Sequence, residues 1–118
     1  MYKFYYPQKD AWISESSGSS NFGHDQILEI GREYNIDNDL TGVSRALVYF
    51  DMSTIAKDVA TSGPMGLSSD TKYFLKMYSS EATALSDTYT LKANAVSQSW
   101  VEGTGKFIDK PAVTNGVS

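Results

Sequence analysis

The feature that most constrains the fold of this 118-residue chain is a two-residue alternation of side chains, in short segments separated by turn-forming residues. The clearest example is residues 44–50 (SRALVYF), whose odd and even positions would face opposite sides of a sheet. No strand pattern alternates with a full-length helix pattern, as a parallel sheet requires. The sequence therefore predicts antiparallel strands, over residues 2–7, 10–16, 26–32, 44–50, 71–79 and 87–100.

A single short helix is expected directly after the strand that ends at residue 50, over residues 51–58 (DMSTIAKD). The side-chain oxygen of Asp51 or Ser53 can accept a hydrogen bond from a backbone N–H of the first turn and so cap the helix. Gly63 and Pro64 are expected to end it. Its apolar side chains recur at spacings of three and four and share one face, which comprises Met52, Ile55, Ala56 and Val59.

Turn-forming and polar residues separate the expected strands. Loops are expected over residues 17–25 and 33–43, a linker over 64–70, and irregular structure over 101–118. A chain of this length forms one domain. Residues 1–118 are therefore expected to be a single all-β domain, an antiparallel β-sandwich with one short helix.

The charge and composition of the chain argue against several classes of protein. The formal net charge is -4 and the ten basic residues are scattered, whereas a nucleic-acid-binding protein concentrates them on one face. No run approaches the roughly 18 apolar residues that cross a membrane, and the first residues lack the apolar part of a secretion signal. The absence of cysteine excludes disulfides and a thiol nucleophile. We expect neither a nucleic-acid partner nor a membrane partner.

No set of residues matches a catalytic or metal-binding pattern. His24 is the only histidine, stands in a loop beside Asp25, and lacks further ligands at metal-site spacing. No Gly-x-Ser-x-Gly sequence presents a serine for His24 to activate. Residues 102–106 (EGTGK) lack the spacing of a phosphate-binding loop. The chain is therefore predicted to be non-enzymatic, with no catalytic residue, no cofactor and no metal.

The acidic residues leave two alternatives open. Residues 37–42 (DNDLTG) begin like a calcium loop but lack the alternating acids and final glutamate of an EF-hand, so a solvated turn is favoured over a calcium site. A pair of glutamates could hydrolyse a glycosidic bond, although a single sequence cannot place two of them at the required separation. The candidates are Glu15, Glu29, Glu33, Glu81 and Glu102.

Aromatic side chains are the remaining candidates for binding. Tyrosine and tryptophan rings exposed on a sheet or loop can stack on sugar rings, as in many β-sandwich modules that bind carbohydrate. For each ring, a place in the core or in a cross-strand pair is favoured over such a role. The candidate contacts with a glycan or a protein partner are Trp12, Tyr34, Tyr49 and Tyr78.

Six short motifs, DAWI, NFG, LEIG, SRALVYFDMSTI, YFLKMYSSEA and AVSQSWVEGTGKF, follow one another along nearly the whole chain. Their order resembles that of DNRLRE-type domains, which are jelly-roll-like β-sandwiches similar to some carbohydrate-binding modules. The resemblance implies structural roles for Arg45, Phe50, Asp51 and Trp100. Asp51 is expected to cap the helix, and Arg45 to pair with an acid on a neighbouring strand or loop.

The aromatic first segment, the PQKD sequence and the VSQSWVEGTGKF motif resemble the N-terminal part of virion structural proteins of tailed bacteriophages. The resemblance implies a multi-copy attachment or decoration module of the capsid, neck, tail or fibre, made in the host cytoplasm and released in the virion by lysis. Those proteins continue with further strands beyond the position of Ser118. The sandwich is therefore expected to be incomplete at its C-terminus, either because the chain is the N-terminal part of a longer protein or because a partner supplies the strands. An open edge would bind other virion proteins by strand addition.

Three functions follow in order of preference. The favoured one is a non-enzymatic virion structural protein that binds neighbouring virion proteins. The alternative is a carbohydrate-binding module that recognises glycans through exposed aromatic side chains. A glycan-hydrolysing enzyme comes third.

Overall fold

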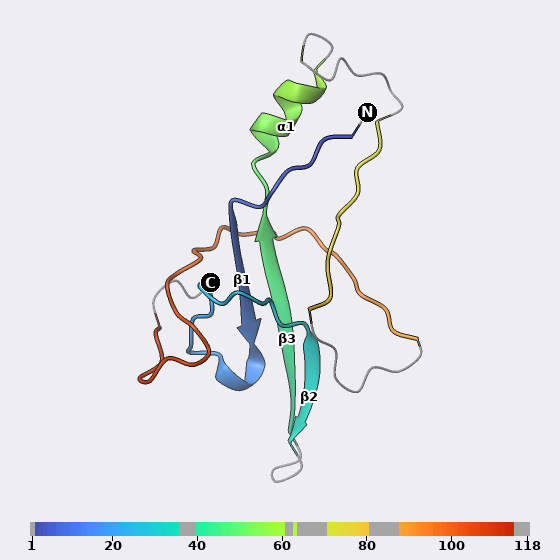
Figure 1. Ribbon diagram of the computed structural model, residues 1–118. Helices are drawn as coiled ribbons and strands as arrows, with labels where there is room; N and C mark the ends of the chain where they lie inside the picture. Colours follow the sequence, from blue (N-terminus) through green and yellow to red (C-terminus); the bar gives the residue numbers. More distant parts are fainter. Residues whose placement is uncertain (1, 36–39, 61–62, 64–70, 81–87, 115–118) are drawn as a thin grey trace.

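The computed structural model of the chain contains a three-stranded antiparallel sheet, one α-helix and long extended segments (Figure 1). It describes residues 2–35, 40–60, 63, 71–80 and 88–114. Strand β3 is central in the sheet, and β1 and β2 flank it. The elements in chain order are β1 (Lys9–Ser14), the 3-10 helix η1 (Glu15–Ser17), β2 (Gly31–Asn35), β3 (Leu40–Tyr49) and α1 (Met52–Val59).

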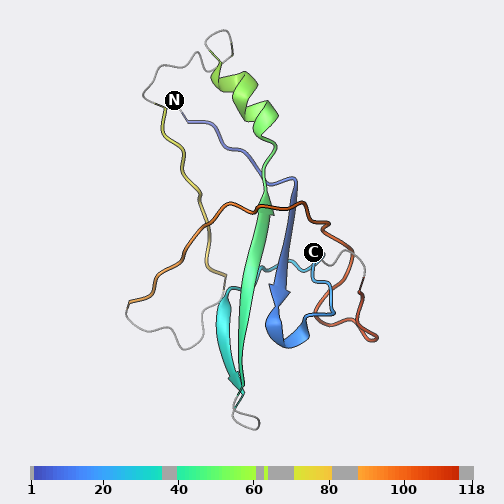
Figure 2. The ribbon, with the colours of Figure 1, turned by 180° about the vertical axis from the view of Figure 1, so that it is seen from behind.

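The predicted combination of antiparallel strands with one short helix is confirmed. The strands of the described residues form a single sheet, and the second sheet of the expected jelly-roll-like sandwich is not among them (Figures 1 and 2). The radius of gyration is 17.6 Å, whereas a compact domain of this length has about 13–14 Å. The chain is therefore more open than a closed sandwich.

Strand β3 is long because each half of it pairs with a different neighbour. Its C-terminal half pairs with β1, where Lys9 lies opposite Tyr49. Its N-terminal half pairs with β2. Ser44 belongs to both ladders, since it lies opposite Ser14 of β1 and Gly31 of β2. The side chains of Ser44 and Ser14 are buried at this meeting point of the three strands.

Helix α1 begins at the predicted cap. Asp51 Oδ1 accepts hydrogen bonds from the N–H and the hydroxyl of Ser53, at 2.9 and 2.6 Å, and Oδ2 accepts one from the hydroxyl of Thr54 at 3.1 Å. These bonds, above all the one from the Ser53 hydroxyl, lower the pKa of Asp51 because they favour its ionised form. On the apolar face predicted for the helix, Ile55 is buried and Met52 is exposed.

Helix α1 extends one residue beyond the predicted range of 51–58 and ends before Gly63, which was expected to stop it. The helix ends at Val59, where Ala60 donates its N–H to the carbonyl of Ala56 at 3.0 Å. Gly63 donates its N–H to the carbonyl of Ala60 at 2.7 Å. Pro64 lies outside the described residues. No helix in the described part of the chain has the length and apolarity needed to cross a membrane.

A small aromatic core covers one face of β1. The rings of Trp12 and Phe22 stack with their centroids 4.1 Å apart and their planes 12° from parallel. The Phe107 ring lies 6.0 Å from each of them. This cluster joins β1, the loop after η1 and the C-terminal segment. The buried apolar residues of the described chain are Ala11, Trp12, Phe22, Ile55 and Trp100.

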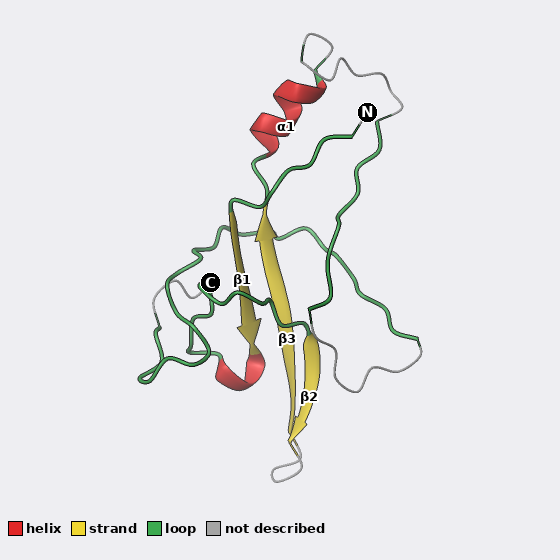
Figure 3. Cartoon of the chain, viewed as in Figure 1, coloured by secondary structure: helices red, strands yellow, loops and turns green. Residues whose placement is uncertain are grey.

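Three segments predicted as strands have no strand partner in the described structure (Figure 3). They are residues 2–7, residues 71–79 and the described part of 87–100. Nearly all of their side chains are exposed, at odd and even positions alike. A strand needs an extended backbone and also a neighbouring strand with which to form hydrogen bonds. Alternation in the sequence indicates an extended backbone but does not show whether a neighbour is present. The prediction of strands is therefore wrong for these described residues.

The predicted boundary around β2 is also wrong. The expected strand over residues 26–32 begins only at Gly31, and the expected loop over 33–43 contains parts of β2 and β3. Cross-strand pairing places polar residues such as Asn35 and Thr41 in the ladder. The loop predicted from composition over residues 33–43 is therefore too long. The strand predicted over 44–50 is present over residues 44–49, as the second half of β3.

Candidate functional site

Trp12 is a core residue and not an exposed stacking platform. Its side chain is 4% exposed, and one face of its ring is covered by Phe22. Its indole N–H donates to Asp25 Oδ2 at 2.8 Å, and Oδ1 of the same carboxylate accepts the backbone N–H of Phe107 at 3.1 Å. Of the two places considered for Trp12, the structure supports the core, because Phe22 covers its ring. Alternation along β1 does not reveal which segments cover that face.

Asn21 joins two glycine-containing loops that are far apart in the sequence. Its Oδ1 accepts the N–H of Gly23 at 3.1 Å and that of Gly105 at 2.8 Å, and its Nδ2 donates to the carbonyl of Glu102 at 2.8 Å. A Cβ at Gly23 would lie 1.8 Å from the Glu102 carbonyl oxygen, and one at Gly105 would lie 2.1 Å from the Asn21 carbonyl oxygen. The NFG and EGTGK motifs are therefore a packed junction. Their pairing was not predicted from the sequence, although the glycines in both motifs were an available signal.

Trp100 is buried beneath a lysine that also contacts a tyrosine of β3. The ammonium of Lys9 lies 4.4 Å from the centroid of the Trp100 ring and 5.2 Å from that of Tyr49. Lys9 also donates to the Trp100 carbonyl. This cation–π arrangement holds the C-terminal segment against the start of β1. It leaves Tyr49 partly exposed.

Arg45 and Phe50 occupy opposite ends of the apolar run in β3 and after it. Arg45 is exposed, lies opposite Ile13 in the ladder, and forms no ion pair with an acid among the described residues. The partner expected for Arg45 is therefore not found within the described chain. Phe50 is half-buried between β3 and the cap residue Asp51.

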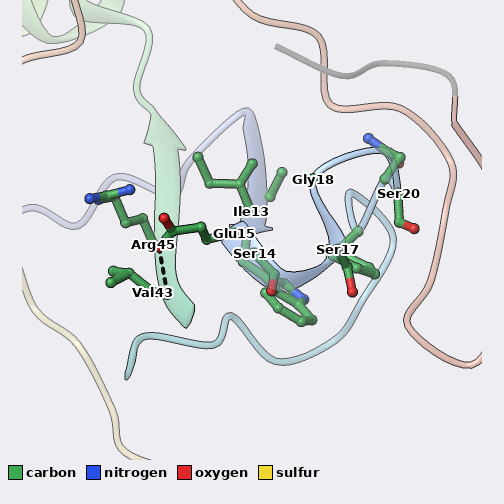
Figure 4. Close-up of a pocket in the computed structure, with 12 residues that line it drawn as sticks. Ile13, Ser14, Glu15, Ser17, Gly18, Ser20, Val43 and Arg45 are labelled. Atoms are coloured by element: carbon green, nitrogen blue, oxygen red, sulfur yellow. Dashed lines mark hydrogen bonds between the residues drawn. The ribbon is translucent and has the colours of Figure 1, made fainter. Parts of the chain in front are cut away.

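A pocket of about 270 Å³ lies between β1, η1, the loop after η1 and β3 (Figure 4). Glu15 closes one side, since its carboxylate accepts the backbone N–H of Val43 at 3.1 Å. Ser17 and Ser20 contribute to its polar lining, and Arg45 lies on its β3 side. Trp12 and Phe22 also line the pocket but are almost fully buried. The pocket therefore offers hydroxyl and charged groups without an exposed ring face.

The three tyrosines proposed as glycan contacts are exposed but do not form one site. Tyr34 lies opposite Thr41 near the start of β3, and Tyr49 ends that strand. The eight positions between Thr41 and Tyr49 correspond to about 26 Å along a strand. Tyr78 belongs to the extended segment 71–80, where the ammonium of Lys76 lies 5.0 Å from its ring.

The described residues contain no group of three or more metal-ligating side chains. His24 is exposed in its loop, and its backbone N–H donates to the carbonyl of Gly105 at 2.9 Å. Residues 37–39, the acidic part of the candidate calcium loop, lie outside the described residues. The predicted absence of a metal site therefore stays a prediction.

Glutamates described in the structure bind polypeptide groups. Glu102 Oε1 accepts the backbone N–H of Asp10 at 2.8 Å, and Glu29 accepts the hydroxyl of Ser44 at 3.5 Å. Burial, together with the charge of Glu102, raises the pKa of Asp10. The side chains of Glu33 and Glu81, two further candidates for a hydrolytic pair, lie outside the described part.

The N-terminal segment is fastened to α1 through one carboxylate. Lys3 forms an ion pair with Asp58, and the hydroxyl of Tyr5 donates to Asp58 Oδ2 at 2.8 Å. The hydrogen bonds from Lys3 and then Tyr5 lower the pKa of Asp58, because both favour its ionised form. This contact fixes which side of residues 2–7 faces the helix.

The sequence profile of carbohydrate-binding module family 96 matches residues 1–118, the whole chain. This match places the protein, with its antiparallel strands and exposed aromatic side chains, in the class of carbohydrate-binding modules. The chain belongs to carbohydrate-binding module family 96. No curated protein and no solved structure matches it.

The family assignment favours the second of the three functions predicted from the sequence. Carbohydrate binding is supported, and a family of binding modules is consistent with a non-enzymatic role. The comparisons support neither the DNRLRE-type assignment nor the role in a bacteriophage virion.

Proposed function

We propose that the chain is a non-catalytic module that binds glycans through exposed aromatic side chains. The observation that carries this proposal is the match of carbohydrate-binding module family 96 over the whole chain. The C–H faces of a sugar ring pack on an aromatic ring, while the surrounding sugar hydroxyls bond to polar groups. Tyrosine can make both kinds of contact, because its ring is apolar and its hydroxyl is polar.

The described chain supports this mode of binding. Eight of its residues are tyrosine, and Tyr34, Tyr49 and Tyr78 expose their rings. An exposed ring loses little side-chain freedom when a ligand stacks on it, since a tyrosine side chain has few rotatable bonds. These three tyrosines are candidate contacts named from the sequence.

Affinity gel electrophoresis tests the proposal with a panel of soluble polysaccharides: hydroxyethylcellulose, xylan, mannan, laminarin and polygalacturonate. We expect at least one of them to retard the protein relative to a non-binding reference protein. A folded sample, identified by a dispersed NMR spectrum, that is retarded by none of the panel would contradict the proposal.

The same panel tests the hydrolase alternative. We expect no new reducing ends after prolonged incubation of the protein with each polysaccharide. Release of reducing ends that disappears in Glu102→Gln or Glu15→Gln would instead establish an enzyme. A place in a virion remains a prediction of the sequence resemblance, which electron microscopy of assembled particles would check.

A further inference from the structure

Three aromatic side chains project from alternate positions of the N-terminal segment. Tyr2, Phe4 and Tyr6 are 93%, 67% and 85% exposed. Alternate residues of an extended chain share a side, so these three rings form one row, which we call the aromatic row. Exposed aromatic surface of this extent is uncommon on a soluble protein unless it binds something.

The opposite side of the segment is held by α1. Lys3 and Tyr5, which alternate with the aromatic row, both bond to Asp58 in the last turn of the helix. The two contacts leave the row directed away from that carboxylate. The rings are therefore presented by an anchored segment, and less ordering is needed when a ligand binds.

A second segment meets the aromatic row at its centre. The ammonium of Lys76 lies 5.6 Å from the centroid of the Phe4 ring and 5.0 Å from that of Tyr78. Tyr78 is itself exposed. Figures 1 and 2 show residues 71–80 beginning close to the N-terminus and running down beside the sheet. Lys76 thus links a fourth exposed ring to the row, although Phe4 remains largely uncovered.

We infer that the aromatic row binds an extended polysaccharide chain, with successive sugar units stacked on Tyr2, Phe4 and Tyr6. The inference rests on the proposed function and names its site. Rings two residues apart in an extended segment are separated by about 6.5–7 Å, and the whole row spans roughly 13 Å. The first spacing is longer than one sugar unit of an extended glycan. The whole row is long enough to contact more than two units.

The row fits a glycan chain better than the pocket beside η1 does. The pocket is about 270 Å³ in volume and its aromatic residues, Trp12 and Phe22, are buried, so it could admit a single unit without stacking. The row is open along its length. The tyrosine hydroxyls at its two ends provide polar groups beside the apolar Phe4 ring, which matches the mixed polar and apolar surface of a sugar chain.

The test uses the panel polysaccharide that retards the protein most, together with its oligosaccharides from the monosaccharide to the hexasaccharide. Isothermal titration should give an affinity that rises with length until the row is filled, and no measurable binding of the monosaccharide. Tyr2→Ala, Phe4→Ala and Tyr6→Ala should each weaken binding roughly 3- to 10-fold. The triple variant should lose retardation, and Phe4→Trp should keep it.

Two matched variants control for these substitutions. Tyr89→Ala removes another exposed ring, and Arg45→Ala removes a charge beside the pocket. Both should bind as the unaltered chain does. Circular dichroism should show no change in any variant, because every substituted side chain is exposed.

The outcomes separate the inference from the proposed function. If the unaltered chain is retarded and the triple variant is retarded equally, the aromatic row is not the site, while carbohydrate binding stands. Loss of binding in Arg45→Ala alone would assign binding to the pocket and overturn the inference. A dimer that becomes monomeric in the triple variant would show that the row binds a second copy of the chain. Absence of retardation by every polysaccharide would contradict the proposed function itself.

Discussion

Asn21 accepts a hydrogen bond from the backbone N–H of Gly105, 84 positions later in the chain, at 2.8 Å. The same amide bonds to the backbone of Gly23 and Glu102. One buried side chain thus satisfies backbone groups of two loops and holds the C-terminal segment against the aromatic core.

Replacing Asn21 with alanine should destabilise the fold. The substitution removes three hydrogen bonds and leaves buried backbone groups without partners, so we expect a loss of roughly 2–3 kcal/mol in the free energy of unfolding. Urea denaturation followed by circular dichroism measures it. The control is Asn94→Ala, at an exposed position, which should stay within about 0.5 kcal/mol of the unaltered chain. Equal midpoints for the two variants would contradict a structural role for Asn21.

Gly105→Ala should be more damaging than Gly31→Ala. A Cβ at Gly105 would lie 2.1 Å from the Asn21 carbonyl oxygen, whereas nothing lies within 4 Å of one at Gly31. The backbone must shift in the first variant, so we expect at least about 2 kcal/mol of destabilisation there and no more than about 0.5 kcal/mol in the second. Thermal melting compares them, and equal melting temperatures would refute the close approach of the two loops.

Acid should weaken the start of α1 through Asp51. Hydrogen bonds from Ser53 and Thr54 lower the pKa of Asp51 in the folded chain below its ordinary value of 3.8. A lowered folded-state pKa gives a stabilisation that is complete above the ordinary value and is lost as the pH falls through the folded-state pKa. Asp51→Asn keeps a capping oxygen but no longer titrates.

The measurement is the melting temperature between about pH 2 and pH 6. The unaltered chain should lose stability toward the acid end more steeply than Asp51→Asn does. Part of the acid dependence should survive in that variant, because the pKa of Asp58 is also lowered, by Lys3 and Tyr5. Identical pH profiles for the two proteins would mean that the cap contributes no acid dependence.

Glycan binding should leave tryptophan fluorescence nearly unchanged. Trp12 and Trp100 are both buried and lie outside the aromatic row, so stacking of sugars on Tyr2, Phe4 and Tyr6 does not touch them. The emission maximum should be that of buried indoles, and iodide should quench it weakly. A large shift on addition of a bound polysaccharide would place the glycan against a tryptophan and not on the row.

The parts of the structure that were predictable from sequence are those fixed by neighbouring residues. Asp51 caps α1 through residues two and three positions away, and the alternation of 44–50 reports a strand. The burial of Trp12 depends on Phe22 and Phe107, which reach it from elsewhere in the chain. A single sequence does not show which distant residues will pack against Trp12.

The candidate site also has features that neighbouring residues predict and features that depend on distant contacts. Tyr34, Tyr49 and Tyr78 were possible contacts in the sequence, and all three are exposed. The aromatic row was instead assigned to a strand, because Tyr2, Phe4 and Tyr6 alternate as strand residues do. The side of the segment that faces α1 is set by the bonds of Lys3 and Tyr5 to Asp58, a contact across more than fifty residues that local patterns do not encode.

The attachment to Asp58 also determines how the molecule would carry tension. The N-terminal segment leads directly into β1, and α1 follows β3, so both leave the sheet at the end where Lys9 lies opposite Tyr49. A pull on residues 2–6 alone would slide β1 along β3 and load their hydrogen bonds in shear. Because Lys3 and Tyr5 bond to Asp58 of α1, the pull is shared between β1 and β3. It moves both strands in the same direction, so their hydrogen bonds are protected.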